Sequence, residues 1–338
     1  MRSQLPRLIL HFDINGTIVI TDPASGRSFT DSLNKALAQG DWDASATYPP
    51  SKVQKDNSIT KSDLVNSLRW PDGINIDPAL CRDGVHHFIF PSFFNAITEL
   101  AKAKREFTIV FRTFGSDIAE VKKAINAYAA GNHPFYGYAG SEELHLPDTR
   151  IWTGRYGGGR FPPEGIEQLT STKPISTSFT LRNQDDPSRL IEKEDDVLKV
   201  LECRHQPRST VACTDHYHWW RAHNYQPSSG KPIWLTADDD TSHHIFFDDN
   251  IHKSATDSIV AVRHRSTANI PFHPLSGADT VSLHGYQTVR VQTTNAILDH
   301  NYFLNKIQDC EMIWMKKRRE IDEKEGKKLL ARVKTDNH

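Results

Sequence analysis

The chain has 338 residues, 37% apolar and 25% charged, so it is long enough for one large domain with insertions or for two smaller ones. Its 41 basic and 42 acidic residues nearly cancel, which excludes a global positive field of the kind that binds nucleic acid or anionic membranes. The four cysteines are widely separated, and no stretch approaches the roughly 18 apolar residues of a membrane span. We therefore expect a soluble, cytoplasmic protein with free thiols.

The first element expected is a buried strand close to the start of the chain. The apolar run Leu8–Phe12 ends at Asp13, and Gly16 follows at once, which indicates a strand that runs into a polar turn. The β-branched residues and turn formers that come next predict a small hairpin over Thr17–Phe29.

A second strand is expected over Phe107–Phe111, which is apolar apart from one threonine and leads into Thr113. Apolar residues at helical spacing predict a helix before this strand, over 92–104, and another after it, over 117–130. Residues 40–90 are polar and punctuated by prolines, so they indicate a smaller insertion.

The second half of the chain is expected to supply further strands, of which the clearest, His244–Phe247, stops at Asp248 and Asp249. Residues 132–230 contain a triple glycine, paired prolines and Ser/Thr clusters, which predict a loop-rich insertion or cap. Strands alternate with helices over most of the length. This alternation predicts an α/β fold with a Rossmann-like, mostly parallel sheet covered by helices, built from residues 1–131 and 231–338.

Polar side chains stand at the ends of three of these strands: Asp13 with Asn15, then Thr113, then Asp248 with Asp249. Ligands of open α/β sheets bind outside the carboxyl ends of the strands, so these side chains converge if the three strands are neighbours. Carboxylates gathered in one place repel one another unless a hard cation lies among them, and Mg²⁺ takes oxygen ligands of this kind. The backbone N–H groups of the glycine turn after the first strand can bind an anion.

This layout resembles the haloacid dehalogenase-like (HAD) superfamily of phosphohydrolases and phosphotransferases. The segment His11–Thr17 (HFDINGT) stands in the place of that family's DxDGT loop, and the strands that end at Thr113 and at Asp248 resemble its second and fourth motifs. The third motif is a lysine before the acidic strand. Lys231, 17 residues before Asp248, is one candidate, and Lys173 is the other.

The resemblance implies a HAD-like core with an inserted cap, and a role for each motif residue. Asp13 would be the nucleophile that attacks phosphorus and forms an aspartyl-phosphate. Asp13, the backbone carbonyl of Asn15 and Asp248 would bind Mg²⁺, and Asp249 would hold the lysine or a metal-bound water. The phosphoryl group of a phosphorylated small-molecule substrate would be held by the two turns and the lysine, through Ile14, Gly16, Thr113, Phe114, Gly115 and Lys231.

One position departs from the family's pattern. Hydrolases of this family usually carry a second aspartate two residues after the nucleophile, which protonates the leaving group and then activates water. This chain has Asn15 there, and an amide can do neither. Four explanations stay open: substrates with good leaving groups such as acyl phosphates or pyrophosphates, a proton from another residue, transfer to an acceptor other than water, or binding of a phosphorylated ligand without hydrolysis. The last of these is the alternative function.

Overall fold

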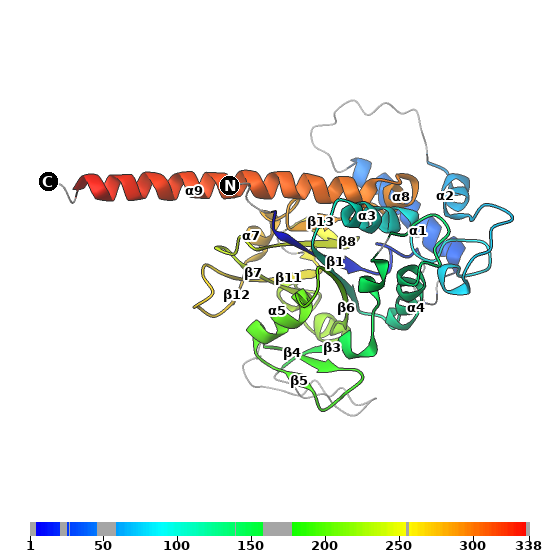
Figure 1. The fold of residues 1–338 in the computed structure, drawn as a ribbon, viewed down its shortest axis with the longest axis horizontal. Coiled ribbons are helices and arrows are strands. Elements are labelled where there is room, and N and C mark those ends of the chain that lie inside the picture. Colours follow the sequence, from blue (N-terminus) through cyan, green and yellow to red (C-terminus); the bar gives the residue numbers. More distant parts are fainter. Residues whose placement is uncertain are drawn as a thin grey trace.

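The computed structural model describes residues 5–20, 26, 28–45, 59–138, 140–157, 178–254 and 257–335. Within these ranges the centre of the molecule is an eight-stranded sheet with the order β13-β8-β1-β2-β6-β3-β4-β5 (Figure 1). From β13 to β3 in this order the strands run parallel, and β4 and β5 are added antiparallel at one edge. The strands are β1 Arg7–Asp13, β2 Phe107–Thr113, β3 Ile151–Tyr156, β4 Phe179–Asn183, β5 Leu190–Ile191, β6 Arg208–Thr214, β8 Ser242–Asp248 and β13 Thr288–Arg290.

Two smaller sheets and the helices complete the described part of the chain. A three-stranded sheet has the order β12-β11-β7, and a two-stranded sheet pairs β9 with β10. These strands are β7 Lys231–Thr236, β9 Ile251–Ser254, β10 Asp257–Ser258, β11 Val260–Arg265 and β12 His273–Pro274. The α-helices are α1 Phe29–Ser45, α2 Lys61–Leu68, α3 Pro91–Lys102, α4 Ile118–Ala129, α5 Glu194–Glu202, α6 Tyr217–Ala222, α7 Gly277–Val281, α8 Thr293–Leu298 and α9 Tyr302–Thr335. Over the described residues, no helix combines the length and the apolarity that crossing a membrane requires.

Different layers cover the two faces of the central sheet, because successive residues of a strand point to opposite sides. From β1, Leu8, Leu10 and Phe12 join a large core cluster with residues of α3, α4 and α9. Ile9 of the same strand joins a second cluster with residues of α5 and β7. Figure 1 shows α3 and α9 on one side of the sheet and α5 on the other, with α9 extending well beyond the body of the molecule. The central strands are therefore buried on both faces.

The structure confirms the predicted fold class, an α/β fold with a mostly parallel sheet flanked by helices. It also confirms that the three strands with polar ends are neighbours. β1 lies between β2 and β8, so that Leu10 pairs with Ile109 on one side and with Ile245 on the other. The carboxyl ends of the three strands consequently meet at one edge of the sheet.

The predicted division of the chain into a core and an insertion at 132–230 does not match the strand composition of the central sheet. Residues 132–230 are expected to form an insertion or cap, but the described parts of this range contribute β3, β4, β5 and β6 to the central sheet. β6 pairs with β2 from end to end and is an interior strand. The sequence of β6 does not predict a buried interior strand, because Ser209 and Thr210 are polar. Both are nevertheless buried, and their hydroxyls donate hydrogen bonds to the carbonyls of Cys203 and His145.

Several expected features fall partly outside the described residues. The hairpin Thr17–Phe29 includes 21–25 and 27, and the smaller insertion at 40–90 includes 46–58. The part of the expected cap at 158–177 also lies outside them. Within the described part, Asn15 forms an isolated bridge with Val19, and α2 lies in the smaller insertion.

Four of the five histidines buried among the described residues are His11, His87, His133 and His243. Burial lowers the pKa of each of them: well below the ordinary value for His11, to about 3 for His87 and His243, and to about 4 for His133. The fold therefore resists protonation of these rings, whereas the unfolded chain accepts it.

We expect the free energy of unfolding to fall as the pH is lowered from about 7 to about 5. Each buried ring gains a proton near pH 6.5 only when the chain unfolds, so each one removes about 2 kcal/mol over this interval. Burial raises the pKa of Asp13 and Asp249, which take up protons first in the folded chain and offset part of the loss. Urea unfolding at the two pH values should therefore show a smaller free energy of unfolding at pH 5 than at pH 7. A chain that is equally stable or more stable at the lower pH would contradict this account.

Candidate functional site

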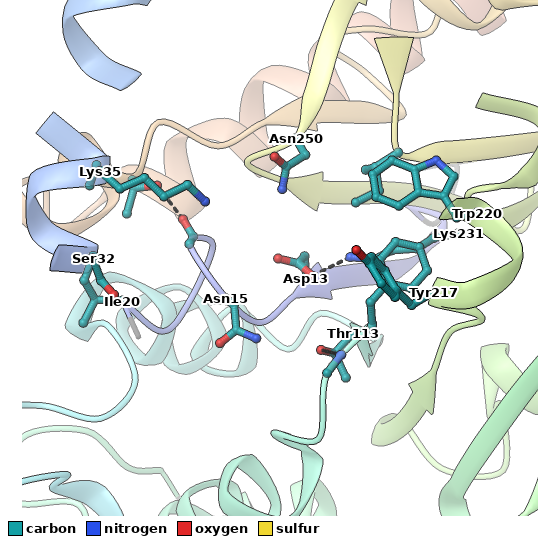
Figure 2. Close-up of a pocket in the computed structure, with 16 residues that line it drawn as sticks. Asp13, Asn15, Ile20, Ser32, Lys35, Thr113, Tyr217, Trp220, Lys231 and Asn250 are labelled. Carbon is teal, nitrogen blue, oxygen red and sulfur yellow. Dashed lines mark hydrogen bonds and ion pairs between the residues drawn. The ribbon is translucent and has the colours of Figure 1, made fainter. Parts of the chain in front are cut away.

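The candidate site lies where β1, β2 and β8 end (Figure 2). Asp13 is the last residue of β1, Thr113 is the last of β2, and Asp248 is the last of β8. Asp13 and Thr113 line a cavity of about 390 Å³, together with side chains from α1 and α6. The sheet thus places Asp13 and Thr113 at the floor of the cavity, whereas Asp248 and Asp249 are not among the residues that line it.

Lys231 bridges the carboxylates at the ends of the adjacent strands β1 and β8. Its Nζ donates to Oδ1 of Asp13 and, at 2.8 Å, to Oδ2 of Asp248. The lysine begins β7, in the neighbouring three-stranded sheet, and is buried. Burial by itself lowers the pKa of Lys231, but the charges of Asp13 and Asp248 outweigh this effect and raise it, so the lysine is held as a cation. The competing candidate, Lys173, lies outside the described residues.

Asp249 adds a third carboxylate to the site. Its Oδ2 is buried without a hydrogen-bond partner among the described residues and lies 3.8 Å from Nζ of Lys35. Burial, and then the charge of Asp248, raise the pKa of Asp249 to about 6. Burial likewise raises the pKa of Asp13 well above its ordinary value, an effect that Lys231 opposes but does not cancel. The fold therefore confines more negative charge here than the two lysines offset.

These carboxylates suit a hard divalent cation. Asp13, Asp248 and Asp249 each offer an oxygen, and the three oxygens lie within 4.8 Å of one another. Oδ2 of Asp249 accepts no hydrogen bond from the described residues, and its ion pair with Lys35 is as long as 3.8 Å. Mg²⁺ takes carboxylate oxygens and keeps waters or phosphate oxygens in its remaining positions, so the donor set fits this ion.

The turn after β1 requires glycine at position 16. Gly16 has a φ of +82°, and a Cβ there would come within 2.7 Å of Oδ2 of Asp249. The N–H of Gly16 donates to the carbonyl of Val19 at 2.7 Å, and the carbonyl of Ile14 accepts from the N–H of Ile18 at 3.0 Å. The Gly16 N–H, which we expect to bind a phosphate, therefore donates within the turn in this structure. The Ile14 side chain belongs to the core.

The turn after β2 differs from the expected phosphate cradle for the same reason. The N–H of Gly115 donates to Oγ1 of Thr113 at 2.8 Å, so it too has an internal partner. Phe114 presents its ring to the cavity, and Nζ of Lys231 lies 5.1 Å from the centre of that ring. The side chains of Thr113 and Lys231, which we expect to hold a phosphoryl group, both line the cavity.

Asn15 is held by Asp117, a residue that no sequence motif singles out. Nδ2 of Asn15 donates to Oδ2 of Asp117 at 2.7 Å, and Oδ1 of Asn15 is buried with no hydrogen-bond partner among the described residues. Asp117 is itself buried and immediately precedes α4. Asn15 is thus fixed by one N–H of its amide, and its Oδ1 is left as an acceptor.

Three other side chains that line the cavity belong to no sequence motif. Lys35 lies on α1, and Tyr217 and Trp220 lie on α6; all three line the cavity. Neither helix shows a pattern that distinguishes a site-facing side chain from an exposed one, so only tertiary packing reveals them. Asp117 carries a weak signal, since it follows the strand-end Thr113 by four residues at the start of a helix.

A fully buried ion pair lies beneath the site. Arg112, in β2, donates through Nε to Oδ2 of Asp215 at 2.9 Å and through Nη2 to Oδ1 at 2.5 Å, and both side chains are 0% exposed. Nη1 of Arg112 also donates to the carbonyl of Pro232 at 2.9 Å. Because Pro232 follows Lys231 directly, this pair connects β2 and the end of β6 to the strand that carries the site lysine.

No protein-family model matches the chain, and neither a curated protein nor a solved structure matches it. A fold class alone does not define an activity. The functional argument therefore rests on the chemistry of the site.

Proposed function

We propose that this chain is an Mg²⁺-dependent phosphatase or phosphotransferase of the HAD-like type, acting through an aspartyl-phosphate at Asp13. The position of Asp13 carries the proposal: its buried carboxylate ends a central parallel strand, lines a cavity and is bonded to Lys231. Such a carboxylate is placed to attack a phosphoryl group from the floor of the cavity. The cavity of about 390 Å³ suits a phosphorylated small molecule.

The residues at the strand ends and Lys231 each have a role in the proposed reaction. An oxygen of Asp13 forms a bond to phosphorus while the bond to the leaving oxygen breaks, and an acceptor such as water later takes the phosphoryl group and restores the carboxylate. Lys231 and Thr113 hold the phosphoryl oxygens. Asp13, Asp248 and the backbone carbonyl of Asn15 would hold Mg²⁺, which when bound neutralises charge on those oxygens.

Asn15 favours a second candidate function, the binding of a phosphorylated ligand without hydrolysis. Its Nδ2 is engaged by Asp117, and its Oδ1 can only accept a hydrogen bond. It can neither protonate a leaving group nor activate water, and such help typically contributes about 10²–10⁴-fold to a rate. The two candidate functions therefore differ in turnover rather than in binding.

The proposal predicts phosphate release that depends on Mg²⁺. The full chain, incubated with acetyl phosphate, pyrophosphate or phenyl phosphate, should release inorganic phosphate in the presence of MgCl₂, and EDTA should abolish the release. Excess Mg²⁺ added after EDTA should restore it. Equal release with and without EDTA would contradict a metal-dependent reaction, and binding of these compounds without any release would support the second candidate.

We expect Asn15→Asp to raise the hydrolysis of esters with poor leaving groups by about 10²–10⁴-fold. The new carboxyl group would lie against that of Asp117, and two carboxyls at hydrogen-bond distance keep one proton at a raised pKa. This proton can then be donated to the leaving group. Phosphate release from glycerol phosphate, measured relative to acetyl phosphate, gives the size of the effect.

Asp117→Asn is the matched control for this variant. It removes the carboxylate that holds Asn15 but adds no acid to the cavity, so the ratio of glycerol phosphate to acetyl phosphate hydrolysis should not rise. An equal gain in both variants would show that release of Asn15, and not acid catalysis, is responsible.

A further inference from the structure

Three aromatic side chains form one wall of the cavity. Phe114 follows β2, while Tyr217 and Trp220 lie on α6, and all three line the cavity. The rings of Phe114 and Trp220 stack with centroids 5.1 Å apart, and Tyr217 meets Phe114 edge-on at 5.7 Å. Figure 2 shows Tyr217 and Trp220 beside Lys231, across the site from Lys35. A phosphoryl group held by Lys231 would therefore have this wall within reach of its ester group.

The wall also carries an unused hydrogen-bond donor. Nε1 of Trp220 is buried and has no hydrogen-bond partner in the described part of the chain, although buried tryptophan N–H groups usually find one. Two other polar atoms at the cavity, Oγ of Ser32 and Oδ1 of Asn15, are also buried without a partner there. Buried polar atoms without partners cost free energy. Their gathering around one cavity indicates a ligand that supplies polar atoms as well as an apolar surface.

We propose that the cavity takes phosphate monoesters of planar aromatic alcohols, with the aromatic ring against Phe114, Tyr217 and Trp220. Stacking of a ligand ring on this wall adds to the gain from burying its area. The volume of about 390 Å³ lies near the lower end of small-molecule sites, about 300–1,000 Å³, which favours a single aryl group over a large conjugate. Turnover of these esters rests on the function proposed above, whereas the binding preference does not.

The chemistry of Asn15 points to the same class of ester. When Asp13 attacks phosphorus, the bond from phosphorus to the ester oxygen breaks, and that oxygen leaves with the electron pair. An aryl ester releases a phenolate, whose conjugate acid has a pKa of about 10 as in tyrosine, and this anion can depart and then take its proton from water. An alkyl ester would release a far more basic alkoxide, for which Asn15 supplies no proton. Water then attacks the aspartyl-phosphate, releasing phosphate and restoring Asp13.

Binding of two non-hydrolysable probes tests the proposal without requiring turnover. Calorimetric titration of the full chain in MgCl₂ with phenylphosphonate and with methylphosphonate compares ligands that share a phosphonate group and differ in the ring. We expect phenylphosphonate to bind at least about tenfold more tightly, which is the size of one or two good stacking contacts. Equal affinities, or no binding of phenylphosphonate, would overturn the proposal.

Two leucine variants on the same helix locate the effect. Trp220→Leu should reduce the preference for phenylphosphonate to about twofold, because the wall loses its largest ring. Trp219→Leu is the matched control, since Trp219 packs against Tyr156 and His223 rather than lining the cavity, and it should keep the preference. If Trp220→Leu fails to fold, Tyr217→Leu removes a ring that is half-buried at the same wall. A preference that survives in both Trp220→Leu and Tyr217→Leu would overturn the proposal.

The outcomes separate this proposal from the function on which turnover depends. Mg²⁺-dependent hydrolysis of acetyl phosphate with no preference for the phenyl probe would leave the proposed function intact and reject the aromatic subsite. Tight, Trp220-dependent binding of phenylphosphonate with no hydrolysis of any ester would establish the subsite and reject the enzymatic function.

Discussion

Asp13→Asn should reduce phosphate release from acetyl phosphate by at least about 10³-fold, because the substitution removes the atom that attacks phosphorus. The side chain keeps its size, and the amide oxygen can still accept a hydrogen bond from Lys231. Initial rates measured in MgCl₂, with wild type at the same concentration, give the ratio directly.

Loss of activity in this variant should not reflect loss of the fold. Burial raises the pKa of Asp13, so the ionised carboxylate is disfavoured in the folded chain, and a neutral amide in its place relieves that cost. The melting temperature of Asp13→Asn should therefore equal or exceed that of wild type. A variant that melts normally and still releases phosphate at the wild-type rate would exclude Asp13 as the nucleophile.

Asp215→Asn should lower the free energy of unfolding by about 3–5 kcal/mol, the cost of leaving one charge of a buried pair without its partner. Arg112 would lose its bidentate carboxylate while remaining fully buried. The damage should extend to the site, because Arg112 also binds the carbonyl of Pro232 beside Lys231. Urea unfolding followed by circular dichroism measures the loss.

Two comparisons show whether burial is the cause. Asp196→Asn makes the same substitution in a solvent-exposed pair with Lys199 and should leave the unfolding curve unchanged. The double variant Arg112→Leu/Asp215→Leu removes both charges together and should be more stable than Asp215→Asn, because no uncompensated charge stays buried. A double variant less stable than the single one would mean that hydrogen bonds, and not unpaired charge, dominate.

The central strands could be predicted because each is a short apolar run that ends abruptly in polar residues. Phe107–Phe111 and the run before Asp248 have this form, and both proved to be neighbours of β1. β6 could not be recognised, since its buried Ser209 and Thr210 read as loop residues until their hydrogen-bond partners are known. The expected cap at 132–230 followed from this omission.

At the site, too, the side chains at strand ends could be predicted from the sequence, whereas the use of the backbone donors could not. Asp13, Asp248 and Asp249 were predicted to converge because they follow strand ends, and the structure brings their carboxylates together. Lys231 also reaches this cluster, although it does so from the start of a strand in a different sheet. The engagement of the Gly16 N–H could not be foreseen, because turn geometry decides which backbone donors stay available.

The residues missed at the site are those placed there by helix packing. Lys35 reaches Asp249 from α1, and Trp220 reaches the cavity from α6. Their positions depend on how each helix is rotated against the sheet, and the apolar pattern of neither helix is clear enough to predict that rotation.

Locating a phosphoryl group on the protein tests the central claim most directly. The full chain would be mixed with acetyl phosphate and MgCl₂, quenched in acid within seconds, digested and mapped by mass spectrometry. The account predicts a hydroxylamine-sensitive phosphoryl group on Asp13 that is absent from Asp13→Asn. Phosphate release with no phosphoryl group on Asp13, or an adduct that persists in Asp13→Asn, would contradict it.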